Sequence, residues 1–470
     1  MAESRREILF EKETISRAVM ALSVPTILSS LVMVMYNMAD TYFVGLLNDP
    51  VQTGAVTLAA PVLLAFNAVN NLFGVGSSSM MSRAMGRKDM DTVYRCSAFG
   101  FYGALVCGLL FSLVCTVFRE PLLLILGADA LTSPPTNGYM DWTVTLGAVP
   151  SILNVVMAYL IRSEGAALHA SIGTMSGCFL NIILDPIFIL PWGFNMGAAG
   201  AGFATCISNV CALVYFLAYL FVKRNSTCVS ISPRHISLDK KIIAGVCGVG
   251  VPASIQNLLN VVGSTALNNL AAPFGTAALA AMGICTKINM VPMYVAMGFS
   301  QGVMPFISYN YSSGDHKRMR GALSFSIKIV EVMLVLSAAA MFFFAGPLVR
   351  AFIGDQETVA YGARFLRGFC LAQPFLALDF LCVGVFQAVG MGREALVLAI
   401  LRKAVFEIPL LYLLNRFFPL YGLPYAQAVT ECVMAAIAVG LVVRFLGRLK
   451  NELQRILLDV WKNPLYIYGE

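Results

Sequence analysis

A small set of ionisable side chains stands inside the long apolar runs of this 470-residue sequence. In the hydrocarbon core of a membrane such a side chain costs about 3 kcal/mol or more, so its usual role is to bind or move an ion, a proton or a polar ligand. The acidic members are Asp40, Asp185, Glu331, Asp379, Glu407 and Glu431, and the basic members are Lys287, Lys328, Arg402 and Lys403.

Asp40 has polar neighbours on its own helical face. Tyr36 and Asn37 precede it by four and three residues, so all three side chains project from one side of a helix and can share hydrogen bonds. This pattern predicts a polar patch inside an apolar run. The alternative is that Asp40, which stands near the end of its run, reaches water at the outer surface.

Asp185 stands at a proline kink. Asn181 lies one helical turn before it, and Pro186 removes an amide that would have bonded to the carbonyl of Ile182. The alternative is a purely structural polar kink. Loss of water favours a neutral carboxyl that can carry a proton, whereas an ionised carboxylate among carbonyl groups can hold Na⁺. The sequence leaves both chemistries open for Asp40 and Asp185.

The elements that position these residues are about twelve apolar runs between residues 20 and 446. Each run has roughly 18–25 residues, which is enough to cross a hydrocarbon core of about 30 Å as a helix. Apolar residues make up 58% of the chain and charged residues 12%, with a mean hydropathy of +0.77. The composition therefore predicts an all-α membrane protein.

The 32 Lys and Arg residues are dense in alternate loops and sparse in the loops between them. Because positive charge gathers on the cytoplasmic side, we expect both termini in the cytoplasm. This topology and contact with anionic lipid explain the net charge of +7, so no nucleic-acid partner is expected. The predicted parts are a cytoplasmic N-terminal segment (1–17), a first six-helix lobe (18–222), a cytoplasmic linker (223–241), a second six-helix lobe (242–446) and a cytoplasmic C-terminal tail (447–470).

The two lobes repeat one sequence frame. The pairs of matching landmarks, each about 227 residues apart, are Val24-Pro25 with Val251-Pro252, Gly74 with Gly302, and Gly86 with Gly314. Because each half has six spans, the halves have the same orientation and form parallel repeats. Paired bundles around a cavity at the membrane midplane are a recurring plan of transporters.

A polytopic membrane enzyme is the least favoured class. The three His residues lie near loops, and the twelve Cys residues include no CxxC pair. The sequence therefore predicts no cofactor, no disulfide framework and no metal site beyond a possible Na⁺ at Asp40 and Asp185.

Flexible apolar and aromatic side chains suit an adaptable cavity for a small amphipathic molecule. We expect Asp379 to join this cavity, since no Lys or Arg lies within one turn of it. The candidate cavity residues are Met33, Tyr36, Asn37, Met157, Met282, Met290, Met293 and Asp379.

Several motifs resemble those of the multidrug and toxic compound extrusion (MATE) family, in its bacterial branch, across nearly the whole chain. In the first half they are Pro25, Asp40 and Gly45, the loop Arg83–Asp89, Arg162–Gly165, and Asn181–Pro186 followed by Gly197–Gly200; in the second half they are Phe386–Gly390 and Ile408-Pro409.

This resemblance implies an antiporter of the bacterial cytoplasmic membrane that expels amphipathic, often cationic, drugs in exchange for H⁺ or Na⁺. It implies that Asp40 and Asp185, with Asn181, Asn154 and Thr205, form the cation site. We expect the protein to work as a monomer in the lipid bilayer. The alternative is a flippase or exporter of a lipid-linked or polysaccharide precursor, because related families share this architecture.

Overall fold

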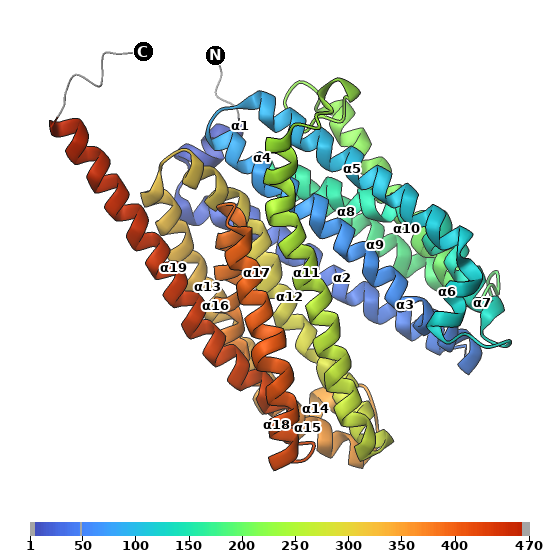
Figure 1. Cartoon of the computed structure of the whole chain (residues 1–470). Coiled ribbons are helices and arrows are strands. Elements are labelled where there is room, and N and C mark those ends of the chain that lie inside the picture. The colour runs from blue at the N-terminus through green and yellow to red at the C-terminus, as the bar shows by residue number, and fades with distance from the viewer. Residues whose placement is uncertain (1–4, 48, 463–470) are drawn as a thin grey trace.

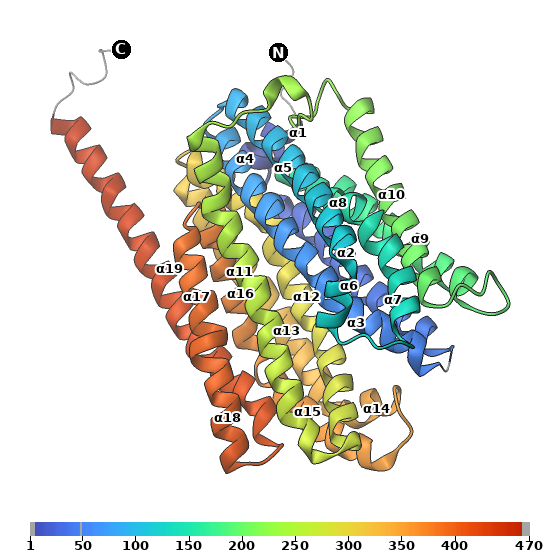
Figure 2. The same cartoon turned by 45° about the vertical axis from the view of Figure 1, so that its right-hand side comes forward.

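The computed structural model describes residues 5–47 and 49–462, and every regular element in these ranges is helical. Figures 1 and 2 show two helical bundles side by side, one formed by the first half of the chain and the other by the second half. The predicted fold class, an all-α membrane protein of two parallel bundles, is confirmed.

The first bundle contains long apolar helices joined by short turns. Asp49 and Asp89 cap the starts of α3 and α5, because their carboxylates accept the amides of Val51 and Thr92. Its elements are α1 (Arg5–Glu7), the π-helical η1 (Ile8–Lys12), α2 (Ile15–Gly45), α3 (Pro50–Asn70), the π-helical η2 (Asn71–Val75), α4 (Gly76–Gly86), α5 (Met90–Val117), α6 (Arg119–Leu126), α7 (Ser133–Met140), the π-helical η3 (Asp141–Thr145), α8 (Ala148–Ser163), α9 (Ala167–Ile189) and α10 (Ala198–Val222).

The second bundle follows a short linker that contains a single 3₁₀ turn. Asp239 and Asp315 cap the starts of α11 and α13 in the same way. The elements are η4 (Pro233–His235), α11 (Lys240–Ala271), the 3₁₀ turn η5 (Ala272–Phe274), α12 (Thr276–Ser312), α13 (His316–Phe343), α14 (Ala345–Arg350), α15 (Gln356–Cys370), α16 (Gln373–Ala388), α17 (Gly392–Ile400), the π-helical η6 (Leu401–Glu407), α18 (Ile408–Phe417) and α19 (Gly422–Lys462).

Nine helices in the described ranges are long and apolar enough to cross a membrane, and two bent helix pairs raise this number to eleven. The bent pairs are α7–η3 with α8, at 44°, and α15 with α16, at 48°. The predicted eleventh span corresponds to the continuous helix α17–η6–α18. It contains three charged residues close together, Arg402, Lys403 and Glu407, and these charges exclude it from the count of apolar spans.

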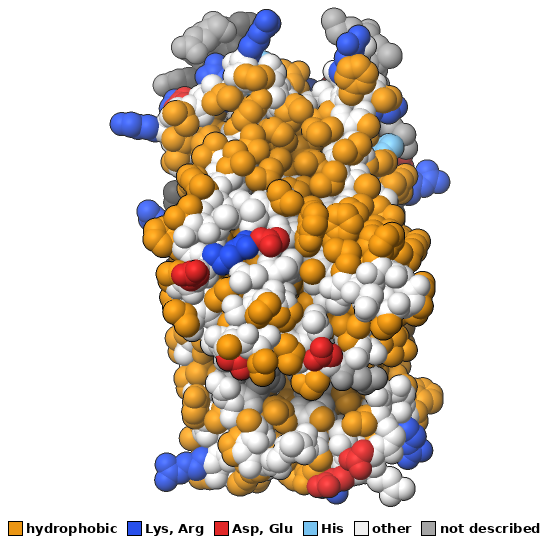
Figure 3. Space-filling model, turned by 90° about the vertical axis from the view of Figure 1, so that its right-hand side faces the viewer, with side chains coloured by type: hydrophobic (Ala, Val, Ile, Leu, Met, Phe, Trp, Pro, Cys, Tyr) orange, Lys and Arg blue, Asp and Glu red, His pale blue; other side chains and the backbone are white. Residues whose placement is uncertain are grey.

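The first and last described helices end at the same end of the molecule, as an even number of spans requires. We call this the α1 end. On the face drawn in Figure 3, Lys and Arg side chains gather at the α1 end, and hydrophobic side chains cover much of the surface below it. The cytoplasmic location of the α1 end remains a prediction.

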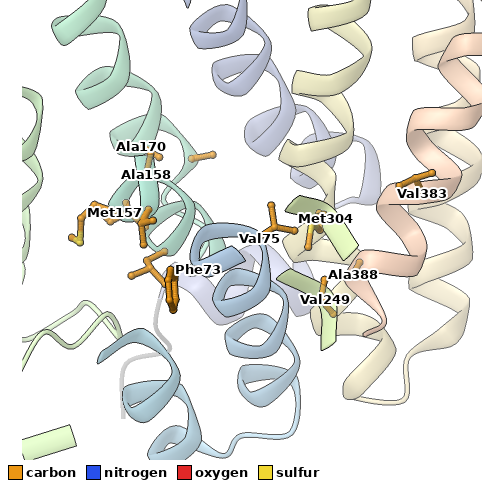
Figure 4. Close-up of a cluster of buried hydrophobic side chains, with 14 of the residues drawn as sticks. Phe73, Val75, Met157, Ala158, Ala170, Val249, Met304, Val383 and Ala388 are labelled. Atoms are coloured by element: carbon orange, nitrogen blue, oxygen red, sulfur yellow. The ribbon is translucent and has the colours of Figure 1, made fainter. Parts of the chain in front are cut away.

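The two bundles touch closely near the α1 end and diverge toward the other end. Glycines allow the approach: a Cβ added at Gly250 would lie 2.0 Å from the carbonyl oxygen of Leu72, and one added at Gly76 would lie 2.3 Å from that of Val246. Figure 4 shows that one buried apolar cluster crosses the junction, with Phe73 and Val75 from the first bundle and Val249 and Met304 from the second.

Gly250→Leu should therefore force the bundles apart at the α1 end. Overpacking of this kind costs about 1–3 kcal/mol, which shifts a two-state equilibrium by roughly 5-fold to 150-fold. The distance between labelled unnatural amino acids at positions 87 and 241 should lengthen. Gly248→Leu is the matched control, because a Cβ at Gly248 meets nothing within 4 Å. Equal distances in the two variants would contradict the prediction.

Candidate functional site

Asp40 on α2 and Asp185 on α9 come together inside the first bundle, where α2 packs against α9. Asp185 is 0% exposed, and Asp40 is partly buried and close enough to interact with it electrostatically. The Oδ1 atom of Asp40 is buried and has no hydrogen-bond partner in the described parts of the chain. Asp40 thus lies inside the protein and not at the outer surface.

Asn181 connects Asp185 to α10. The groups around its amide set its orientation: the nitrogen donates to Oδ2 of Asp185 at 2.8 Å, and the oxygen accepts from the amide and hydroxyl of Thr205 at 3.1 and 3.2 Å. Pro186 follows directly and lies inside α9, which continues to Ile189. Asp185, Asn181 and Thr205 therefore form one buried hydrogen-bonded group beside Asp40.

A cavity of about 430 Å³ lies next to these carboxylates. Tyr36 and Asn181, each one turn from an acidic residue, belong to its wall, whereas Asp40 and Asp185 stand behind that wall. No Lys, Arg, Asp or Glu is among the lining residues. They are Met33, Tyr36, Asn37, Ala60, Leu63, Leu64, Phe66, Asn67, Asn70, Thr143, Gly147, Ser151, Asn154, Val155, Thr174, Gly177, Cys178, Asn181, Thr205, Cys206, Ser208, Asn209 and Tyr294.

Neutral polar groups on this wall have free hydrogen-bonding capacity. Asn154 donates to the Oδ1 of Asn209 at 3.1 Å. The buried side-chain oxygens of Asn70, Asn154 and Ser208 have no hydrogen-bond partner within the described residues. Buried polar atoms without protein partners are places for water or a ligand. The wall can thus hold a hydrated ion or a polar part of a small molecule.

The predicted methionine, tyrosine and asparagine residues of the cavity divide into three groups. Met33, Tyr36 and Asn37 line the cavity. Met157 and Met282 are fully buried in apolar clusters, so they pack and do not face open space. Met290 and Met293, on α12, line neither of the two cavities described for this structure.

Sequence reasoning missed several wall residues that helical spacing would have found. Thr174 and Cys178 precede Asn181 by two turns and one turn on α9, and Ser151 precedes Asn154 by one turn on α8. Periodicity from an already suspected polar residue is the signal for such positions.

Asp379 lies in the second bundle, in a buried ion cluster. Its Oδ2 is 3.2 Å from Nη1 of Arg402, and Arg402 donates from Nε and Nη2 to Oε1 of Glu431 at 2.9 and 2.6 Å. Next to it, Lys403 pairs with Glu407 at 2.6 Å. Asp379 is therefore neutralised by a cation from another helix, and it is not on the wall of either described cavity.

A model of the MatE family matches the chain twice, over residues 25–187 and 252–413. The chain belongs to the MatE family. The two matches begin at Pro25 and Pro252, which are the landmarks that open the two halves of the sequence repeat. The repeat is therefore a duplicated MatE unit.

Curated MATE relatives agree over almost the full length. The chain is 32% identical over 437 residues to the multidrug export protein MepA of Staphylococcus aureus, which covers 93% of this chain and 95% of the relative. It is 31% identical over 448 residues to MepA of Staphylococcus saprophyticus, covering 95% and 98%. The MATE protein described here is an integral membrane multidrug efflux transporter and not an enzyme.

Solved MATE structures share the fold. A crystal structure of MATE in the straight conformation has a TM-score of 0.90 and 25% identity, covering 96% of this chain and all of that one. A MATE multidrug resistance transporter in an outward-facing conformation also has a TM-score of 0.90, at 24% identity. These matches confirm the paired-bundle architecture of the MATE family.

Proposed function

We propose that this protein exports amphipathic, often cationic, drugs in exchange for H⁺ or Na⁺ bound at Asp40 and Asp185. The observation that carries the proposal is the position of these two buried carboxylates directly behind the wall of a 430 Å³ cavity. Asn181, Thr205 and Asn154 complete the proposed cation site. No other molecule than the drug and the coupling ion is required.

The cavity wall suits an amphipathic cation. Tyr36, Phe66 and Tyr294 offer aromatic faces, and the absence of Lys and Arg among the lining residues avoids repulsion. A cation attracted to aromatic faces gains about 0.5–2 kcal/mol per contact. Tyr294 belongs to α12 of the second bundle, so a bound drug would touch both bundles.

The ion and the drug would compete through the first bundle. Binding of a proton or Na⁺ changes the charge behind the wall, which favours a wall conformation with low drug affinity. By linkage, the drug must weaken ion binding by the same factor. The bundles of this structure meet at the α1 end, which we propose to be cytoplasmic, so this arrangement would open outward and admit the ion from outside. We propose that both termini face the cytoplasm, that the membrane is the bacterial plasma membrane, and that a monomer suffices.

A lipid-precursor flippase is less well supported. Its substrate would carry a diphosphate and would need several free cations in a central cavity. Of the three candidate cations, Arg402 and Lys403 are held in ion pairs with carboxylates, which leaves Lys287 as a single cation for two phosphates. The drug cavity has no basic residue in its wall.

The decisive experiment is efflux of one cationic dye from proteoliposomes under separate H⁺ and Na⁺ gradients. We expect one gradient to drive efflux and the other to have little effect, which identifies the coupling ion. Each elementary charge moved across 100 mV supplies about 2.3 kcal/mol, so dye accumulation should also respond to an imposed membrane potential if the exchange is electrogenic. A dye efflux rate that changes with neither ion gradient would refute the antiport proposal. Flipping of a lipid-linked sugar without dye efflux would favour the flippase.

A further inference from the structure

A second cavity, of about 650 Å³, lies between the two bundles, and neither Asp40 nor Asp185 is among its lining residues. The first bundle contributes part of α2 and one residue of α9, and the second contributes α12 and the turn after α14. In Figures 1 and 2, α2 and α12 run next to each other, in agreement with their packing. The lining residues are Met38, Ala39, Thr41, Tyr42, Phe43, Ile182, Ala280, Gly283, Ile284, Lys287 and Phe352.

Lys287 is the one charged residue among these lining residues. Within the described parts of the chain, no hydrogen bond or ion pair involves its ammonium group. Asp40 lies between two lining residues of α2, but its own side chain faces Tyr139 and Asp185 in the first bundle. The cavity therefore presents a positive charge that the protein itself does not balance.

The remainder of the wall is mainly apolar and reachable from outside the protein. Tyr42 is 62% exposed and Phe352 is 48% exposed, and a Cβ added at Gly283 would meet no atom within 4 Å. Lys287 stands eleven residues into α12, about 16 Å along the helix from the end opposite the α1 end. Since α12 is one of the helices long and apolar enough to cross a membrane, Lys287 belongs to a membrane-spanning helix.

We propose that this cavity binds an anionic phospholipid, with the headgroup phosphate on Lys287 and an acyl chain along Met38, Phe43 and Ile284. An anionic lipid is favoured over a neutral one because Lys287 is a cation inside a membrane helix, and such a cation normally needs a counter-charge. A mainly apolar groove that opens at the surface of the protein suits a hydrocarbon chain. A cationic drug is disfavoured at the same place, since Lys287 would repel it.

A lipid in this cavity would touch both bundles at once. It would therefore bind most tightly to the arrangement of the bundles in this structure. Because its affinity for other arrangements would be lower, the lipid would shift the equilibrium toward this one. Lipid binding in this cavity does not involve Asp40 or Asp185. Lipid binding can therefore be present whether or not these two residues couple drug export to an ion.

Native mass spectrometry of the full protein from nanodiscs with mixed phosphatidylglycerol and phosphatidylcholine tests the proposal. Lys287→Gln removes the positive charge that would bind the phosphate, so it should lower phosphatidylglycerol retention at least about fivefold, the effect of one Lys at a membrane surface. Lys287→Arg should retain it. Gly283→Leu, which fills the groove without changing charge, should also lower it.

Lys328→Gln is the matched control, because Lys328 also lies in a membrane helix, α13, and is exposed, but lines neither described cavity. It should leave phosphatidylglycerol retention unchanged. Equal retention by Lys287→Gln and the unaltered protein, or an equal loss in Lys328→Gln, would overturn the proposal. Displacement of phosphatidylglycerol by a cationic dye, with tighter dye binding in Lys287→Gln, would instead make this cavity a drug site and would also overturn it.

Discussion

Asp40→Asn and Asp185→Asn should each remove most of the dependence of drug affinity on H⁺ or Na⁺ while the protein stays folded. Asparagine has nearly the shape of aspartate, so the packing of α2 against α9 is kept, but it can neither ionise nor release a proton. Allosteric coupling of this kind is typically worth about 1–3 kcal/mol, or 5-fold to 150-fold in affinity. In the variants this factor should fall toward one.

The measurement is drug binding to purified protein across a range of pH and of Na⁺ concentration, followed by gradient-driven efflux in proteoliposomes. Asp91→Asn is the matched control, since Asp91 is an exposed residue of α5 that pairs at the surface with Arg95 at 2.8 Å. It should behave like the unaltered protein. Drug affinity that still responds fully to the ion in both Asp40→Asn and Asp185→Asn would rule out these residues as the coupling site.

Arg402→Met should destabilise the second bundle more than any surface substitution. Asp379 is 1% exposed and Glu431 is 0% exposed, and both depend on the Arg402 guanidinium for their counter-charge. The guanidinium also lies over the ring of Phe380, at 5.2 Å. Removal of one partner from a buried ion pair costs about 3–5 kcal/mol, because the other charge remains buried and unbalanced.

The expected result is a large fall in the Tm of the detergent-solubilised protein and poor recovery from membranes. Arg416→Met is the control, because Arg416 is exposed near the end of α18. The triple variant Asp379→Asn, Arg402→Met, Glu431→Gln removes all three charges and should recover much of the lost stability. A Tm equal to that of the Arg416→Met variant would show that the cluster does not stabilise the fold.

The residues of the candidate site could be predicted in part, because the relevant signals are local. An aspartate in an apolar run is unusual wherever the run packs, and a polar residue one turn away shares its helical face. Tyr36 and Asn37 could therefore be predicted from the sequence as neighbours of Asp40, and Asn181 as a neighbour of Asp185. Thr205 and Asn154 lie on other helices and entered only through the family resemblance.

Asp379 shows where spacing within a helix fails. The absence of Lys and Arg within a turn suggested an open position on a substrate cavity. Its partner Arg402 comes from η6, and Arg402 also binds Glu431 of α19, so the pairing depends on which helices are neighbours. The prediction that Met157 and Met282 line the cavity failed for the same reason. A methionine can fill a core or face a cavity with the same sequence pattern.

The sequence by itself determined the membrane class, the duplicated six-span frame and the carboxylates most suited to ion chemistry. These follow from hydropathy, loop charge and the energetic cost of a charge in hydrocarbon, all of which act along the chain. The tertiary structure alone decided that Asp40 and Asp185 lie together behind a cavity, and that Arg402 neutralises Asp379. It also decided that Lys287 faces a groove between the bundles. Contacts between distant helices depend on side-chain packing across both bundles, which no single stretch of sequence contains.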